Sequence, residues 1–326
     1  MNIDVLCLRP EADFVRAGAM PPASLMVIYR APEDSDVPAL MKQARALVIP
    51  AVGPKLPLAW FENATVKFVQ VTGAGLDRLD LDVIKQLGIA VANVPGGSNK
   101  AVAEYVVAVA SVLLRRFAWA DAEIRAGHYS EFRNRMLVEN LSGLDGLIAG
   151  IVGFGVIGFA VAKALHKNGC KILYFDPAPR DQRAAAAFGA ESVSLEDLLK
   201  ASDIVTSHVP LLPTTQGLIG ARELSLMKQG AVLIQASRGG VVDEAALAES
   251  LKVGHLGGAA IDVYSTEPPL ADHPLLALHG EAAQRVLFTP HIAGVTRQAS
   301  AFLFRSAWEN VERVLLANEP PLHRAC

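Results

Sequence analysis

Three residues whose side chains suit binding and protonating a small acid each follow an apolar run that predicts a strand. They are Arg238, Glu267 and His291, after residues 231–236, 258–263 and 285–288. Ligands of open α/β sheets bind beyond the carboxyl ends of the strands, so we expect these side chains at one edge of a sheet. The combination suits reduction of a 2-keto acid, which needs a group that binds carboxylate and a group that gives a proton.

Each member of this trio has a role that its side chain can fill. Arg238 presents a rigid fork of donors for the carboxylate and the carbonyl oxygen. His291 can give the proton, because imidazole titrates near neutral pH, and Glu267 can hold that imidazole and stabilise its protonated form. Taken singly, such residues are more often an ion pair, a turn residue and a structural histidine, so the interpretation depends on what accompanies them.

A glycine-rich turn is the accompanying feature. Gly153, Gly155 and Gly158 form the pattern G-x-G-x-x-G between an apolar run, residues 147–152, and a helix-like run, residues 159–165. In a dinucleotide-binding turn, the first glycine allows the bend, the second lets N–H groups approach a pyrophosphate, and the third lets the helix lie close on the sheet. The helix N-terminus also favours the negative diphosphate, so we predict a dinucleotide site here.

An acidic residue stands where such a site needs one. Asp176 ends the next apolar run, residues 171–175, and lies 18 residues after Gly158. A spacing of about 20 is typical of the carboxylate that binds the ribose hydroxyls. This carboxylate would repel a 2′-phosphate, which favours NAD over NADP, although the nearby Arg180 keeps NADP open.

The same stretch has a competing interpretation as a membrane span, because residues 146–162 are all apolar or glycine. It has 17 residues, closed by Asp145 and Lys163, whereas a span needs roughly 20. The strand and the acid that follow favour dinucleotide binding.

The order of the apolar runs predicts an α/β fold with two parallel-sheet domains, since runs that are apolar on both faces suit parallel strands covered by helices. Strands are expected at 3–8, 25–29, 46–52, 66–71 and 89–94, and then at 147–152, 171–175, 203–208 and the three runs before the trio; helices are expected at 81–86, 195–200, 221–227, 243–253 and 296–317. The last helix is long enough to return to the first domain. We therefore expect a discontinuous substrate-binding domain, 1–98 plus 293–326, and a dinucleotide-binding domain, 99–292.

The sequence changes character between these two domains. Residues 95–99 predict a linker. Residues 101–117 are apolar nearly all round, which predicts a helix buried between domains or at a subunit interface. Residues 118–145 are polar and irregular, which indicates a solvated connector or an arm that clasps a second subunit.

Composition limits the function classes. The 326 residues, 52% hydrophobic and 19% charged, suffice for about two globular domains, and the net charge of −3 gives no basic excess for nucleic acid. Cys7, Cys170 and Cys326 are far apart and indicate neither a disulfide framework nor a metal site. The first residues include an acid and no basic segment, so we expect no signal peptide, no membrane contact and a cytoplasmic protein.

Motifs along nearly the whole chain resemble those of the NAD-dependent D-isomer-specific 2-hydroxyacid dehydrogenases. They are Thr72-Gly73-Ala74-Gly75-Leu76-Asp77, Val102-Ala103-Glu104-Tyr105, the glycine turn with Asp176, His208-Val209-Pro210-Leu211, Ser237-Arg238-Gly239, Asp262 to Pro268, and Thr289-Pro290-His291. The resemblance implies that Arg238, Glu267 and His291 are the catalytic trio of an enzyme that interconverts a 2-keto acid and a D-2-hydroxy acid. It also implies two Rossmann-like or flavodoxin-like domains with an active-site cleft between them, and a homodimer built on the second domain.

The resemblance further implies the binding residues. Backbone N–H groups of Gly73, Ala74 and Gly75 would hold the substrate carboxylate together with Arg238. Asp262 would hold the nicotinamide carboxamide, and no metal ligand is expected. The full set implied for the cofactor is Gly153, Gly155, Val156, Ile157, Gly158, Asp176, His208, Pro210, Ala236, Ser237, Asp262 and Gly294.

The sequence departs from the family pattern in two places. Tyr105 stands where many relatives have histidine and Gly220 where many have asparagine, which bears on local packing more than on the trio. The chain stops soon after its last predicted helix, so we expect no regulatory domain of the kind that longer phosphoglycerate dehydrogenases carry.

Other functions compete with this interpretation. A short-chain dehydrogenase needs Tyr-x-x-x-Lys, which no tyrosine of this chain provides, and a Rossmann methyltransferase does not explain the trio. A dinucleotide-sensing interaction protein, like the corepressors that share this fold, stays open. So does the substrate: glyoxylate, hydroxypyruvate, bulkier and phosphorylated keto acids all suit the trio, and Lys55 would favour an extra anionic group.

Overall fold

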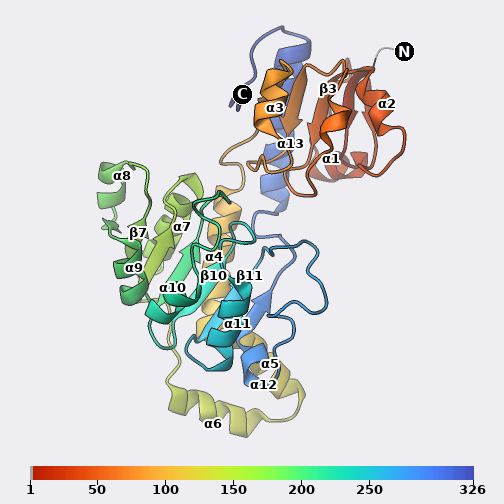
Figure 1. Cartoon of the computed structure of the whole chain (residues 1–326). Coiled ribbons are helices and arrows are strands. Elements are labelled where there is room, and N and C mark those ends of the chain that lie inside the picture. The colour runs from red at the N-terminus through yellow and green to blue at the C-terminus, as the bar shows by residue number, and fades with distance from the viewer. Residues whose placement is uncertain (1–2) are drawn as a thin grey trace. The chain divides into compact units, whose positions relative to one another are not determined.

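The computed structural model describes residues 3–326, which form two compact units. The first unit consists of residues 3–98 and 295–326, and the second of residues 99–294. Each contains one parallel sheet with helices packed on it (Figure 1). The predicted α/β class with two parallel sheets is confirmed.

The sheet of the first unit has five parallel strands in the order β2-β1-β3-β4-β5, which is the flavodoxin-like order. The strands are β1 (Ile3–Cys7), β2 (Val27–Tyr29), β3 (Ala44–Ile49), β4 (Phe68–Val71) and β5 (Ala90–Ala92). Both faces are buried, because successive side chains of β3 enter two different apolar clusters: Val48 joins one and Leu47 the other.

Helices cover both faces of this sheet. They are α1 (Glu11–Ala17), α2 (Val37–Met41), the 3-10 turn η1 (Leu58–Trp60), α3 (Leu81–Gln86) and α13 (Arg297–Leu315). Although α13 follows the second unit in the chain, it packs on the first sheet beside α1 (Figure 1). Phe304 and Trp308 of α13 are buried, with ring centroids 4.9 and 5.1 Å from that of Phe14. Burying each ring contributes about 1.5–3 kcal/mol, so α13 is an integral part of this unit.

The sheet of the second unit has seven parallel strands in the order β12-β11-β10-β9-β6-β7-β8. The strands are β6 (Ile148–Val152), β7 (Lys171–Phe175), β8 (Glu191–Ser192), β9 (Ile204–Ser207), β10 (Val232–Gln235), β11 (Gly258–Ile261) and β12 (Val286–Phe288). Strand order reverses between β6 and β9, and open α/β sheets bind ligands beyond the carboxyl ends of the strands at such a point. The glycine turn follows β6, so the fold places it there.

Helices again cover both faces of the sheet. They are α4 (Asn99–Leu114), α5 (Phe117–Arg125), α6 (Tyr129–Glu139), α7 (Val156–Lys167), α8 (Gln182–Ala186), α9 (Leu195–Ala201), α10 (Ala221–Leu226), α11 (Glu244–Lys252) and α12 (Gly280–Gln284). Helices α4 and α7 share one apolar cluster with the sheet, and α9, α10 and α11 share the other.

In residues 101–145 the predicted helix is present but ends earlier than expected, and the prediction of an irregular segment is wrong. The helix predicted at 101–117 ends at Leu114, because Arg116 adopts a left-handed conformation (φ 51°) that turns the chain into α5. Its apolar face is covered inside the second unit by α7. Residues 118–145, predicted to be irregular, contain most of α5 and all of α6. Helix α6 buries Phe132 and exposes most of its other side chains, so its sequence lacks the periodic apolar residues that would predict a helix.

The stretch that also suited a membrane span, residues 146–162, contains β6, the glycine turn and the first half of α7. Within residues 3–326, none of the helices combines the length and the apolar character needed to cross a bilayer.

Candidate active site

The glycine turn after β6 has the geometry that a dinucleotide needs. Gly153 has φ 91°, and a side chain there would meet the carbonyl oxygen of His208 at 2.8 Å. A side chain on Gly158 would collide with the carbonyl oxygen of Gly153, whereas space is open beside Gly155. Gly155 is the N-cap of α7 and has no side chain to cap it, so the first N–H groups of this helix stay available to an anion.

Asp176 connects this turn to β7. Its carboxylate accepts the backbone N–H of Phe154 at 2.7 Å and that of Ala178 at 2.9 Å. The guanidinium of Arg180 lies 2.8 Å from the same carboxylate, and the side chain of Asp176 is 5% exposed. The acid is therefore fixed beside the turn, with a cation on its outer side.

His208 follows β9 at the reversal point of the sheet. Its Nε2 contacts the hydroxyl of Thr206 at 2.9 Å, while the buried Nδ1 has no hydrogen-bond partner within residues 3–326. Burial lowers the pKa of His208 to about 3, so the ring is neutral. An unpaired polar atom and an uncapped helix N-terminus beside the glycine turn both fit a bound dinucleotide.

Arg238 projects from the turn after β10, and that turn is braced by side chains. Gln235, which is buried, donates to the carbonyl oxygen of Arg238 at 2.8 Å and accepts from the hydroxyl of Ser237 at 2.8 Å. The Arg238 guanidinium donates to the carbonyl oxygen of Ser237 at 2.7 Å. Ser207, at the end of β9, contacts Ser237 at 3.1 Å, which ties the two strand ends together.

Glu267 and His291 form a direct pair. The Nδ1 atom of His291 lies 2.9 and 3.1 Å from the two carboxylate oxygens of Glu267. Because Nδ1 faces the carboxylate, it carries the hydrogen, and Nε2 is the atom left to exchange a proton with a substrate. Glu267 also accepts the backbone N–H of Tyr264 at 3.1 Å.

Asp262, at the end of β11, fixes the segment that carries His291. Its carboxylate accepts the backbone N–H groups of Ile292 and Ala293, both at 2.8 Å, and the hydroxyl of Thr289 at 2.6 Å. Because the Thr289 hydroxyl donates its hydrogen to Asp262, the hydroxyl of Tyr105 is the donor in the 2.7 Å contact between Tyr105 and Thr289. Burial raises the pKa of Tyr105 to about 12, which keeps this donor protonated.

Residues 107–293 match the family model of the D-isomer specific 2-hydroxyacid dehydrogenase NAD-binding domain. This chain belongs to the D-isomer specific 2-hydroxyacid dehydrogenase family. Since the matched segment is the NAD-binding domain of that family, NAD is the cofactor of the second unit.

Individual 2-hydroxyacid dehydrogenases are similar to this chain over different lengths. A glyoxylate reductase from Thermococcus litoralis is 37% identical over 284 residues, 86% of this chain and 83% of that one. A D-3-phosphoglycerate dehydrogenase from Archaeoglobus fulgidus is 39% identical over 234 residues, 72% of this chain, so the match spans 42% of that relative. The solved structure of a D-lactate dehydrogenase from Treponema pallidum has a TM-score of 0.81 at 27% identity and 99% coverage of both chains.

Some residues that shape the site of this dehydrogenase family member were not singled out for it from the sequence. Thr289 lies in one of the sequence motifs, and Tyr105 lies in another and departs from the family pattern. Neither is expected from the sequence to support Asp262, yet Thr289 bonds to its carboxylate and Tyr105 bonds to Thr289. Glu244 and His273 belong to none of the sequence motifs. They lie 29 positions apart, and their contacts depend on the tertiary fold.

In the first unit, Gly73, Ala74 and Gly75 follow β4. The carbonyl oxygen of Gly73 accepts from the backbone of Val94 at 2.9 Å, and that of Ala74 accepts from the side chain of Asn93 at 2.7 Å. A side chain on Gly73 would approach Ala51 to 2.7 Å. The carbonyl groups of Gly73 and Ala74 are therefore anchored, while the N–H groups of the three residues find no backbone acceptor among the described residues.

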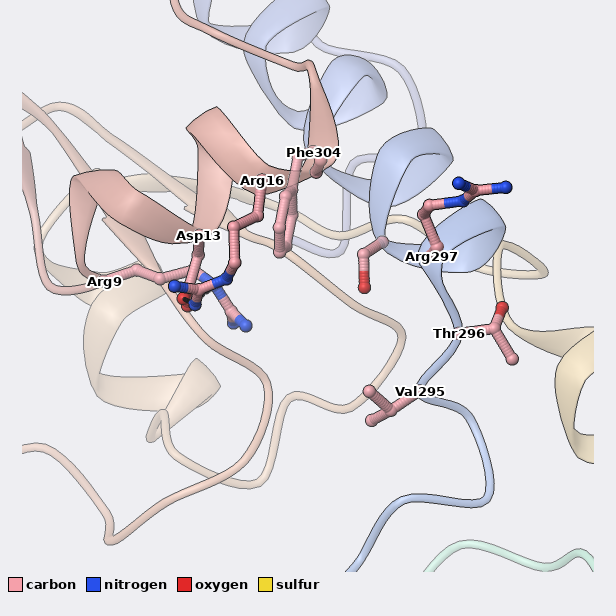
Figure 2. A pocket seen from close by; sticks show the side chains of 9 residues that line it. Arg9, Asp13, Arg16, Val295, Thr296, Arg297 and Phe304 are labelled. Carbon is pink, nitrogen blue, oxygen red and sulfur yellow. Dashed lines mark hydrogen bonds and ion pairs between the residues drawn. The ribbon is translucent and has the colours of Figure 1, made fainter.

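A cavity of about 550 Å³ in the first unit is lined by none of the predicted site residues. Figure 2 shows Arg9, Asp13 and Arg16 converging on one of its walls, with Arg297 on the other side. Asp13 pairs with both Arg9, at 2.9 Å, and Arg16, and Arg9 also lies 4.5 Å over the ring of Phe304. One carboxylate on this wall therefore serves two guanidinium groups, and the wall keeps a net positive charge.

Proposed function

We propose that this chain is an NAD-dependent oxidoreductase that interconverts a 2-keto acid and a D-2-hydroxy acid. Bound NAD supplies or accepts the hydride in this chemistry. The observation that supports the proposal most strongly is the pair of His291 and Glu267, with 2.9 Å between Nδ1 and a carboxylate oxygen. It leaves the opposite nitrogen of a chargeable imidazole for proton exchange, which general acid catalysis of keto-acid reduction needs.

The proposed roles of the side chains follow from their chemistry. In reduction, protonated His291 gives its Nε2 hydrogen to the carbonyl oxygen, and Glu267 stabilises the imidazolium that donates it. Arg238 binds the substrate carboxylate through its fork of donors. The N–H groups of Gly73, Ala74 and Gly75 are proposed to bind the same carboxylate.

We propose a small, unphosphorylated keto acid as the substrate. The glyoxylate reductase is matched over 83% of its length and the D-3-phosphoglycerate dehydrogenase over 42%, so the former is the better guide. The test is NADH oxidation with glyoxylate, hydroxypyruvate, pyruvate, a branched keto acid and phosphohydroxypyruvate. We expect the highest kcat/KM with one of the first three. An absence of turnover across the panel, with NADH still bound, would instead favour a dinucleotide-sensing protein.

We also propose that NADH is used in preference to NADPH, that the enzyme is a homodimer and that it is cytoplasmic. Asp176 beside the glycine turn supports the cofactor preference. The dimer is supported by apolar side chains exposed on α5 and α6, of which Leu137 is 62% and Val138 85% exposed. Neighbouring exposed apolar groups of this size are typical of surfaces that another chain covers.

A further inference from the structure

Glu244 is a carboxylate outside the trio that makes unusually many contacts. Its side chain is 12% exposed. One oxygen accepts the backbone N–H of Ser265 at 2.8 Å, and the other accepts the hydroxyl of Ser265 at 2.5 Å. The second oxygen also lies 3.0 Å from Nε2 of His273, a buried histidine whose Nδ1 accepts the N–H of Leu275 at 3.3 Å.

Capping α11 does not account for this arrangement. Glu244 is the first residue of α11, where an acid interacts favourably with the helix dipole. The neighbouring Asp243, however, already caps the helix by accepting the N–H groups of Ala245 and Ala246, both at 3.0 Å. Glu244 instead turns to the segment that follows β11.

That segment touches two members of the trio. The N–H of Tyr264 donates to Glu267 at 3.1 Å. On the other side of the same residue, a side chain on Gly239, next to Arg238, would collide with the carbonyl oxygen of Tyr264, so the turn that carries Arg238 packs directly on this peptide. The residue after Tyr264 is Ser265, which Glu244 holds by two hydrogen bonds.

We propose that Glu244 is a positioning residue of the dehydrogenase site. By fixing Ser265, it fixes the peptide against which Glu267 and the Arg238 turn are placed, and thereby keeps the Glu267 carboxylate on Nδ1 of His291. This role rests on the proposed function. The charged and titratable groups around the segment are Glu244, His273, Asp262, Glu267, Tyr264, His291 and, on the turn that packs against it, Arg238.

The test separates hydrogen bonding from charge. Glu244→Ala and Glu244→Gln both remove the charge, but glutamine keeps an acceptor oxygen for the N–H of Ser265. We expect Glu244→Ala to lower kcat/KM for keto-acid reduction by about 10- to 100-fold, the usual consequence of a small misplacement of catalytic groups. Its upper pH limit should fall, because His291 loses the ordered carboxylate that stabilises its protonated form. Glu244→Gln should stay closer to wild type on both measures.

Glu249→Ala is the matched control, because Glu249 lies on the same helix, is exposed and pairs with Lys252 at 2.6 Å. It should leave activity and the pH profile unchanged. Equal pH shifts in the alanine and glutamine variants of Glu244 would reduce its role to charge and overturn the proposal. So would a lower melting temperature with unchanged kcat/KM and pH limit. If Glu244→Ala does not fold, Ser265→Ala takes its place, because it removes the hydrogen bond from the hydroxyl of Ser265 to Glu244. A wild-type kcat/KM and pH limit in Ser265→Ala would then overturn the proposal.

A second readout does not depend on turnover. The midpoint of His291 protonation, followed by NMR in the NADH complex, should fall in Glu244→Ala and change less in Glu244→Gln. If the wild-type protein reduces no keto acid but this pattern is found, the proposed function fails and the positioning role stands. If the enzyme is active and the midpoint does not move, the positioning role fails by itself.

Discussion

The backbone N–H of His291 donates a 2.8 Å hydrogen bond to the carbonyl oxygen of Asp262, and the next two N–H groups donate to the Asp262 carboxylate. His291 itself has φ 55°, a backbone conformation that residues other than glycine rarely adopt. Such a conformation persists only where the surroundings hold it. Asp262 therefore holds the main chain of the predicted proton donor, in addition to any contact with the nicotinamide.

Asp262→Asn should destabilise the protein, because an amide keeps one acceptor oxygen and turns an N–H donor toward groups that also donate. We expect a loss of about 1–3 kcal/mol in the free energy of unfolding, together with a lower kcat. Thermal melting and steady-state kinetics check both effects. Asp243→Asn is the control, since asparagine caps a helix as well as aspartate does. An Asp262→Asn protein with wild-type stability would contradict the role given to this carboxylate.

Glu267→Gln should lower the upper pH limit of keto-acid reduction. Reduction needs protonated His291, and loss of the carboxylate on Nδ1 makes that proton easier to lose. A pH–rate profile of Glu267→Gln that overlays the wild type, with Glu249→Gln as reference, would remove Glu267 from this role.

His291→Ala should lower kcat by about 10²–10⁴-fold with little change in NADH affinity.

Asp176→Ser should narrow the preference for NADH over NADPH. The carboxylate next to the glycine turn repels a 2′-phosphate, while its partner Arg180 would attract one once the acid is gone. The measurement is kcat/KM for both cofactors at subsaturating concentration. Arg180→Ala provides the complementary variant and should widen the preference. Wild-type turnover with NADPH equal to that with NADH would disprove the assignment.

His208 should make the protein less stable in mild acid. Its pKa is lowered to about 3 by burial, and an unfolded histidine titrates near 6.5, so below that pH only the unfolded state takes up the proton. The stability contributed by the neutral ring is therefore complete above about pH 6.5 and is lost as pH falls toward 3. When the pH is lowered from 7 to 5, the free energy of unfolding measured in urea should fall by about 2 kcal/mol less in His208→Gln than in the wild type. The exposed His323→Asn should follow the wild type; a His208→Gln protein that does likewise contradicts the prediction.

Val138→Glu should separate the proposed dimer. Placing a charge at a fully covered apolar contact costs far more than at an open surface. Light scattering at micromolar concentration should then report the monomer mass. The control is Val253→Glu, another exposed valine (76%) at the end of α11, which should leave the dimer intact. A monomeric wild-type protein would rule the dimer out.

Much of the dinucleotide region could be predicted because its constraints are local. Gly153 and Gly158 are required by a turn that leaves no room for a side chain, so the sequence itself carries the signal. The strands other than β8 were equally predictable, since buried parallel strands are continuous apolar runs, whereas the two residues of β8 are exposed. The end of α4 could not be predicted, because the left-handed residue that ends it is Arg116, whereas such positions are usually occupied by glycine or asparagine. Helix α6, with Phe132 as its buried residue, has no periodic apolar face.

The supports of the site were hidden for a different reason. His291 and Glu267 could be paired by their positions after neighbouring strands. The contact of Glu244 with Ser265 depends on how α11 and the segment after β11 pack, and neither residue type nor spacing encodes it. Tyr105 is joined to Thr289 across 184 positions, and no local pattern reports a bond of that kind.

The position of α13 has a consequence for biosynthesis. The ribosome must make residues 99–294 after the first five strands and before α13 can emerge. Until then, Phe68 on the sheet and Phe14 on α1 beside it lack Phe304 and Trp308, which later cover them. A nascent chain exposes this apolar surface throughout synthesis of the second unit, and exposed surface of this kind promotes aggregation. Chaperone demand should therefore centre on the first unit, whose last helix is made only after the whole second unit.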